Sequence, residues 1–109
     1  MHYKGTGIDV EFDLEIDQYE FEVVEAVVTD KRIAMDWIQK DSKFHLLATS
    51  SDGGCTYKGH FGCPEPEPDW MMELTRYTAK NKAELFLAQW VQRDSGATGM
   101  SVFRLWRER

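Results

Sequence analysis

Between residues 8 and 17 the chain alternates without interruption between apolar and acidic side chains. The apolar positions are Ile8, Val10, Phe12, Leu14 and Ile16, and the acidic positions are Asp9, Glu11, Asp13, Glu15 and Asp17. A period of two is typical of a β-strand, because successive side chains of a strand point to opposite faces, whereas a helix would spread the acids around its circumference. We therefore expect a strand whose apolar face packs on the core and whose acidic face contacts water.

The same alternation recurs along the rest of the chain, and turn signals separate the segments. Besides residues 8–17, the predicted strands are residues 19–28, 32–37, 44–49, 55–61, 70–78, 83–91 and 98–107. The longest connection is residues 62–69, which contains all three prolines, and proline cannot donate to a ladder. In the second segment the alternation slips by one at Val23 and Val24, which predicts a β-bulge.

Eight strands joined by short connections, with no segment of helical period, predict an all-β antiparallel meander. Such a meander exposes two strand edges, and closing it into an up-and-down barrel removes both. We therefore expect residues 1–109 to form a single β-barrel domain in which the first strand lies beside the eighth. A two-sheet β-sandwich is the alternative.

Length and charge narrow the class of protein. A chain of 109 residues leaves room for one domain. The 13 Lys and Arg residues against 19 Asp and Glu give a net charge of -6, which opposes the counterion release that drives nucleic-acid binding. No stretch approaches the ~18 apolar residues of a membrane span, and residues 1–7 lack the apolar region of a signal peptide. We expect a cytoplasmic protein with neither a nucleic-acid nor a membrane partner.

A short repeat places two tryptophans at equivalent strand ends. Residues 37–42 read Trp-Ile-Gln-Lys-Asp-Ser, and residues 90–95 read Trp-Val-Gln-Arg-Asp-Ser. Either duplication of a four-stranded half or shared turn chemistry explains this repeat. If Trp37 and Trp90 face inward, they lie on opposite walls of a barrel that is just wide enough to hold one small ligand or to be filled by side chains.

The candidate ligand-binding residues are aromatic walls with a polar anchor. The walls are Trp37, Tyr57, Trp70 and Trp90, and the anchors are Arg76 and Arg104. Ligand pockets typically combine apolar walls with a few convergent polar groups. The sequence thus favours a barrel that holds a small apolar or amphipathic molecule, and the alternative is that these aromatics only fill the core.

Three features give the chain a likeness to a known architecture. They are the meander of hairpins, residues 54–59 (Gly-Cys-Thr-Tyr-Lys-Gly), and the strand-end residues Trp37 and Trp90. It resembles the small calycin-type barrels, the group with avidin and lipocalin architecture. This resemblance implies non-covalent ligand binding and no catalysis.

Both faces of the segment 83–91 are apolar, although a strand of a small monomeric barrel normally has one polar face. The neighbouring segments are similar, so a contiguous outer apolar patch is predicted, which is typical of an interface. The predicted interface residues are Leu85, Leu87, Val91, Phe103 and Leu105. We expect a homodimer or higher oligomer, and a barrel with a filled core that acts as an interaction or assembly module is the second hypothesis. Alternatively, a terminal segment or the proline loop covers this patch.

Metal and catalytic chemistry form the weakest hypothesis. His45, Cys55, His60 and Cys63 carry atoms that bind zinc, but the spacing Cys-x4-His-x2-Cys matches no standard zinc motif. A nucleophile elbow, a phosphate-binding glycine loop and a His-Glu-x-x-His pair are all missing. We therefore expect a protein that is not an enzyme and has no catalytic residues, no bound metal and no cofactor.

Overall fold

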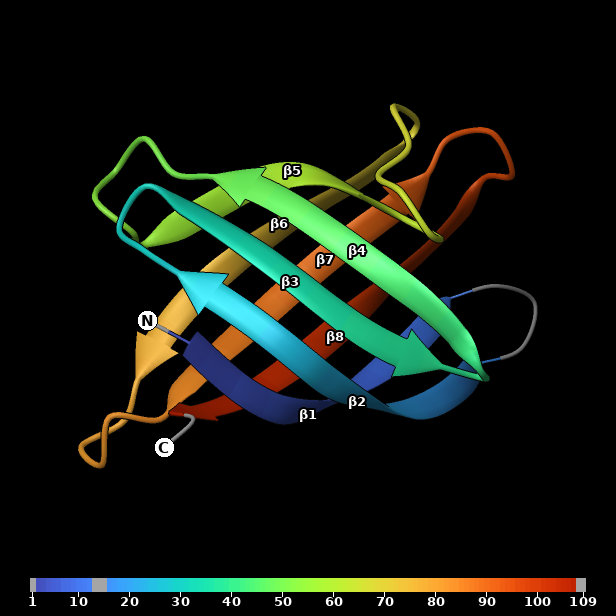
Figure 1. Cartoon of the computed structure of the whole chain (residues 1–109). Coiled ribbons are helices and arrows are strands. Elements are labelled where there is room, and N and C mark those ends of the chain that lie inside the picture. The colour runs from blue at the N-terminus through green and yellow to red at the C-terminus, as the bar shows by residue number, and fades with distance from the viewer. Residues whose placement is uncertain (1, 13–15, 108–109) are drawn as a thin grey trace.

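The computed structural model describes residues 2–12 and 16–107, and these residues form eight strands. The strands are β1 (His2–Phe12), β2 (Ile16–Val28), β3 (Arg32–Gln39), β4 (Ser42–Thr49), β5 (Thr56–Gly62), β6 (Trp70–Thr78), β7 (Glu84–Gln92) and β8 (Ala97–Arg107). Each strand pairs antiparallel with the next, and β1 pairs with β8, so the sheet closes into a barrel (Figure 1). The prediction of an all-β, up-and-down barrel is confirmed, and the architecture is consistent with a calycin-like one.

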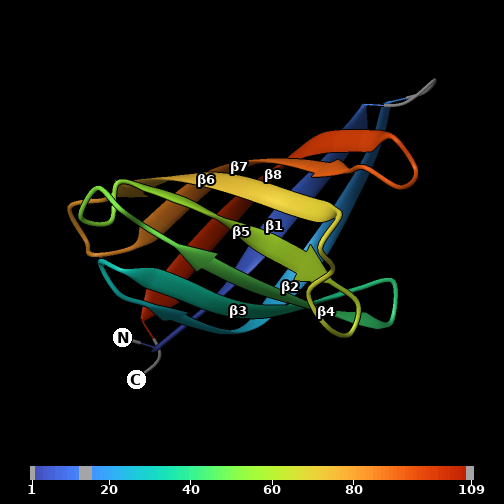
Figure 2. The ribbon, with the colours of Figure 1, turned by 90° about the horizontal axis from the view of Figure 1, so that it is seen from above.

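The ends of the described chain lie side by side because β1 and β8 are neighbours (Figure 2). In the register of this pair, Gly7 lies opposite Phe103 and Asp9 lies opposite Ser101. No segment of the described chain forms a helix long and apolar enough to cross a membrane.

Local signals in the sequence account for the connections. The β-bulge predicted at Val23 and Val24 is confirmed, because the register between β2 and β3 shifts between Val23 and Glu25. The β3–β4 hairpin turns at Lys40 and Asp41, which both adopt positive φ, as a two-residue hairpin turn of the favoured type requires. The proline-containing segment joins β5 to β6 as a long loop.

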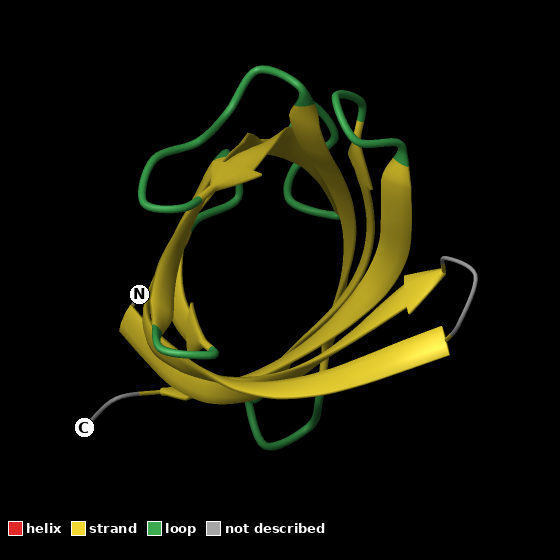
Figure 3. Cartoon of the chain, turned by 90° about the vertical axis from the view of Figure 1, so that its right-hand side faces the viewer, coloured by secondary structure: helices red, strands yellow, loops and turns green. Residues whose placement is uncertain are grey.

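Inward-facing side chains from all eight strands fill the lumen, which Figure 3 views along the barrel axis. The largest side chains with less than 2% exposure are Tyr57, Phe86, Phe103, Ile33, Met35, Leu46, Leu74, Leu105 and Val23. Trp37 and Trp90 are 3% and 5% exposed, which confirms that both face inward. Because β3 and β7 are four strands apart in the closed sheet, these two tryptophans stand on opposite walls.

The facing predicted for the first strand is wrong. Gly5, Gly7 and Asp9 are buried, whereas Ile8 is 36% exposed. A Cβ atom at Gly7 would collide with the ring of Phe21, so the glycine makes room inside the barrel for a large aromatic side chain of β2. The acid side chains of residues 11, 13, 15 and 17 lie outside the part of the chain whose side chains are described.

Candidate functional site

Polar side chains cluster at both ends of the lumen. At the Asp9 end, β3 joins β4, β5 joins β6 and β7 joins β8; this end faces the viewer in Figure 3. At the Arg76 end, β2 joins β3, β4 joins β5 and β6 joins β7. The two ends differ in how their charges are paired, which separates a structural cluster from a candidate binding site.

At the Asp9 end, one carboxylate gathers three neutral donors. Asp9 is 8% exposed, and its Oδ1 accepts hydrogen bonds of 2.8 Å from Trp90 Nε1 and 2.8 Å from Ser101 Oγ. Its Oδ2 accepts a longer bond of 3.4 Å from Gln39 Nε2. Among the described residues, no lysine, arginine or histidine forms an ion pair with Asp9. A buried carboxylate without a cation is costly unless its hydrogen bonds are complete.

Aromatic rings surround this carboxylate. Trp37 stacks on Phe44 with ring centroids 5.5 Å apart and an interplanar angle of 5°, and Phe61 meets Trp90 edge-on at 6.1 Å. A pocket of about 60 Å³ lies between these groups, lined by Asp9, Phe21, Trp37, Gln39, Phe44, Phe61, Met72, Trp90, Gln92 and Ser101. The indole N–H of Trp37 is buried and has no hydrogen-bond partner among the described residues. The Asp9 end therefore combines apolar walls with a carboxylate acceptor and an unpaired donor.

At the Arg76 end, by contrast, the buried charges pair with each other. Glu84 is 4% exposed and accepts two hydrogen bonds from Arg76, of 3.0 Å from Nε and 2.9 Å from Nη2. Thr78 donates a third bond, of 2.8 Å. The Glu84 hydrogen bond raises the pKa of Arg76 above its usual value. This two-pronged ion pair is a structural plug of the lumen.

Tyr57 completes the same plug. Its hydroxyl donates to the carbonyl oxygen of Thr29 at 2.7 Å and accepts a bond of 3.3 Å from Arg76 Nη1. Burial raises the pKa of the Tyr57 hydroxyl above its usual value. The hydroxyl therefore acts as a neutral link between the β2–β3 turn and the ion pair.

The residues predicted to bind a ligand fall into three places. Trp37 and Trp90 line the pocket at the Asp9 end, and Trp70 lies at the same end, with its ring centroid 5.6 Å from that of Phe61. Tyr57 and Arg76 belong to the plug at the other end. Arg104 is exposed on the outer face of β8, so it does not reach the lumen and cannot anchor a ligand there.

The predicted interface residues also separate. Leu85, Leu87 and Val91 lie half-buried on the outer face of β7. Phe103 and Leu105 are 0% and 1% exposed and belong to the core, so their placement on the outer face is wrong. Both faces of β8 carry apolar residues, and the burial pattern of this strand places Ser101 inside together with Phe103 and Leu105.

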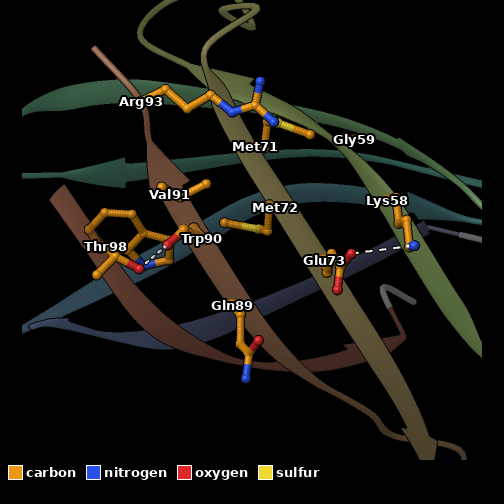
Figure 4. A pocket seen from close by; sticks show the side chains of 10 residues that line it. All are labelled: Lys58, Gly59, Met71, Met72, Glu73, Gln89, Trp90, Val91, Arg93 and Thr98. Carbon is orange, nitrogen blue, oxygen red and sulfur yellow. Dashed lines mark hydrogen bonds and ion pairs between the residues drawn. The ribbon is translucent and has the colours of Figure 1, made fainter. Parts of the chain in front are cut away.

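A pocket of about 280 Å³ lies on the outer face of β5 to β8 (Figure 4). Lys58 and Glu73 form an exposed ion pair of 3.4 Å at one side of it, and Met71, Val91 and Arg93 line it further along. A second outer pocket, of about 270 Å³, shares Glu73 and Gln89 with the first and also includes Leu87. The outer face of these strands is thus grooved and partly apolar.

The four residues considered for zinc do not come together. Cys55 precedes β5 at the Arg76 end, and Cys63 follows the same strand at the opposite end. His60 is exposed, and His45 Nδ1 is hydrogen-bonded to Asp36. Within residues 2–12 and 16–107, no group of three or more His, Cys, Asp and Glu residues is arranged to hold a metal ion.

The polar half of the pocket lies outside the residues that the sequence predicts to bind a ligand. The alternation predicts a solvent-exposed strand face for Asp9, and no local pattern marks Ser101, Gln39 or Gln92 as binding residues. One signal in the sequence points to the inner face. Tyr3, Gly5, Gly7 and Asp9 occupy every second position and so share one face of the strand, and glycine in a strand often marks the close approach of another group.

Comparison of the chain with protein-family models gives no match. Comparisons with curated proteins and with solved structures give none either. The geometry of the lumen and of the outer face is therefore the evidence for function.

Proposed function

We propose that this protein is a non-enzymatic β-barrel that binds the polar head of a small amphipathic molecule at the Asp9 end of its lumen. The observation that carries this proposal is the buried Asp9 carboxylate, which Trp90 and Ser101 hold inside a pocket with aromatic walls. Ligand sites are typically apolar concavities with a few fixed polar groups. Non-covalent binding without catalysis is also what the calycin-like architecture favours.

The size of the pocket limits how much of a ligand enters. Its volume of about 60 Å³ is well below the ~300 Å³ at which pockets for drug-sized molecules begin. A head group of a few heavy atoms is the appropriate occupant. Phe44 and Trp70 are only partly buried against the core, so they offer apolar surface at the rim for the rest of the molecule.

Nuclear magnetic resonance of the four tryptophan indole N–H groups tests this proposal. The ¹⁵N-labelled protein is titrated separately with butylammonium, butanol and butyrate, which share an apolar chain and differ in head-group charge. At least one of them should shift the Trp37 and Trp90 signals in a saturable way. Trp106, which is 49% exposed and lies near the Arg76 end, serves as an internal control.

Loss of one Asp9 partner provides a matched variant. Ser101→Ala removes one donor to Asp9 and should weaken whichever compound binds, whereas Ser51→Ala, at an exposed position of the β4–β5 loop, should leave its affinity unchanged. The proposal is refuted if none of the three compounds shifts Trp37 or Trp90, or if Trp106 shifts equally with them.

A second candidate function is assembly with another copy of the chain through the outer face of β6 to β8. Leu85, Leu87 and Val91 lie there without full burial, next to pockets of about 280 Å³ and 270 Å³. An exposed outer face with partly apolar hollows favours an interface. Sedimentation equilibrium should show a dimer that Leu87→Lys converts to a monomer; a monomeric wild type would remove this candidate.

A further inference from the structure

No cation among the described residues matches the charge of the Asp9 carboxylate inside the lumen. Arg76, the cation at the opposite end, is engaged by Glu84, and Arg104 points outward. Lys40 lies at the Asp9 end, but its Nζ sits 3.5 Å from the centroid of the Tyr19 ring and forms no ion pair with Asp9 within the described part of the chain.

Hydrogen bonding leaves one carboxylate oxygen with capacity for another donor. An ionised carboxyl group accepts at about four lone-pair sites. Oδ1 already accepts bonds from Trp90 and Ser101, whereas Oδ2 accepts, from the residues whose side chains are described, only the 3.4 Å bond from Gln39. A further donor that carries positive charge would pair with Asp9 more strongly than a neutral one, because charge-assisted bonds are about twice as strong.

The walls of the pocket suit the same chemistry. The pocket is lined by five aromatic side chains, Phe21, Trp37, Phe44, Phe61 and Trp90. Aromatic faces attract cations, and the attraction is strongest at desolvated sites. A carboxylate enclosed by aromatic rings repels an anionic head group. A neutral head group gains no charge pairing with that carboxylate.

We infer that the pocket selects a primary alkylammonium group, whose N–H donates to Asp9 Oδ2 while the aromatic rings surround its charge. This inference rests on the proposed function, since it names the chemical class of ligand for the same pocket. The small volume of about 60 Å³ fits a head of this size and places the alkyl chain toward Phe44 and Trp70.

The test uses the same three compounds and asks for selectivity. Butylammonium should bind at least about tenfold more tightly than butanol, and butyrate should not bind, because charge pairing and cation–π attraction act only on the cation. Asp9→Asn should abolish the preference for butylammonium over butanol. The control Glu22→Gln changes net charge equally at an exposed position of β2 and should preserve the preference.

The outcomes separate this inference from the proposed function. If butanol or butyrate binds as well as butylammonium, the ammonium class is wrong although the pocket binds ligands. If none of the three binds, both proposals fail. The selectivity of the wild-type protein decides the matter even if Asp9→Asn does not fold.

A fourth probe, Nα-acetyl-lysine amide, distinguishes two sources of the same group. Binding comparable to that of butylammonium assigns the pocket to a lysine side chain of a peptide, and much weaker binding assigns it to a free amine. Either result requires that butylammonium itself is preferred over butanol.

Discussion

Replacement of Gly7 by alanine tests the placement of β1, on which the pocket depends. In the structure, a Cβ at this position would overlap the ring of Phe21. That ring cannot move away freely, because its centroid lies 5.7 Å from Trp37 and 5.4 Å from Phe103. The added methyl group therefore meets a closely packed aromatic cluster.

The expected cost follows from two opposing effects. Overpacking of a core costs about 1–3 kcal/mol, and replacement of glycine by alanine restores about 0.4–1 kcal/mol by restricting the unfolded chain. Because Phe21 is held on both sides, we expect the upper part of the first range and a net loss of about 2 kcal/mol. Urea unfolding, followed by tryptophan fluorescence and far-ultraviolet circular dichroism, measures this loss.

A second substitution identifies the cause. Phe21→Leu should relieve the overlap, so the double variant should be more stable than the sum of the single changes predicts, by about 1 kcal/mol or more. Thr6→Ala, on the exposed outer face of the same strand, should change the free energy of unfolding by less than about 0.5 kcal/mol. A neutral Gly7→Ala, or strict additivity with Phe21→Leu, would refute the inward placement of this strand face.

Three further predictions concern the polar groups outside the Asp9 end. Glu84→Gln should destabilise the fold by about 3 kcal/mol, the lower end for a broken buried ion pair, since among the described residues it leaves the partly buried Arg76 only the exposed Asp30 as a charge partner. Glu73→Gln, in an exposed ion pair, should cost under about 1 kcal/mol, and equal losses in urea unfolding would contradict this. Hydrogen bonds from Thr56 lower the pKa of Asp52 well below its usual value near 3.8. The stability that ionised Asp52 confers is therefore present above pH 3.8 and is lost as the pH falls below it, so the stability advantage of wild type over Asp52→Asn should shrink in acid. A difference that stays constant with pH would count against the turn geometry. Burial raises the pKa of Tyr57 above 10.0, so the fold favours the neutral hydroxyl, and this stabilising contribution is lost as the pH rises. Tyr57→Phe should therefore remove the last step of the tyrosinate absorbance titration at alkaline pH. If that step persists, another tyrosine is responsible for it.

Strand number, strand order and most turns were predictable because they depend on local signals. The first turn is the exception: unbroken alternation predicts one strand over residues 8–17, whereas β1 ends at Phe12 and β2 begins at Ile16. Period-two alternation, the glycine-containing turns and the proline loop mark the strands and their connections, and the β-bulge at Val24 appeared as a slip in the pattern. Closure of the barrel followed from the need to protect strand edges. These features do not require knowledge of which strand face points inward.

The facing of β1 and β8 was not predictable from alternation alone. A period of two shows which residues share a face, but it does not identify the inner one. In β1 the inner face is rich in glycine, and the more apolar face, which includes Ile8, points outward. In β8 both faces are apolar, so Phe103 and Leu105 were assigned to the wrong side.

The candidate site escaped prediction for a related reason. Asp9 meets Trp90 and Ser101, which are 81 and 92 positions away in the chain. Their meeting depends on the register with which β1 closes onto β8, and no local pattern specifies that register. The aromatic half of the site, Trp37 and Trp90, could be predicted from the sequence because both residues occupy equivalent strand ends.

Intermolecular nuclear Overhauser effects between bound butylammonium and the protein test the central claim most directly. We predict contacts from the ligand protons closest to the nitrogen to the indole N–H of Trp90 and to the rings of Trp37 and Phe61, and contacts from the terminal methyl group to Phe44 or Trp70. Contacts to Trp106 or to the outer residues Leu87 and Val91, with none to Trp37 or Trp90, would contradict the claim that the lumen at Asp9 is the binding site.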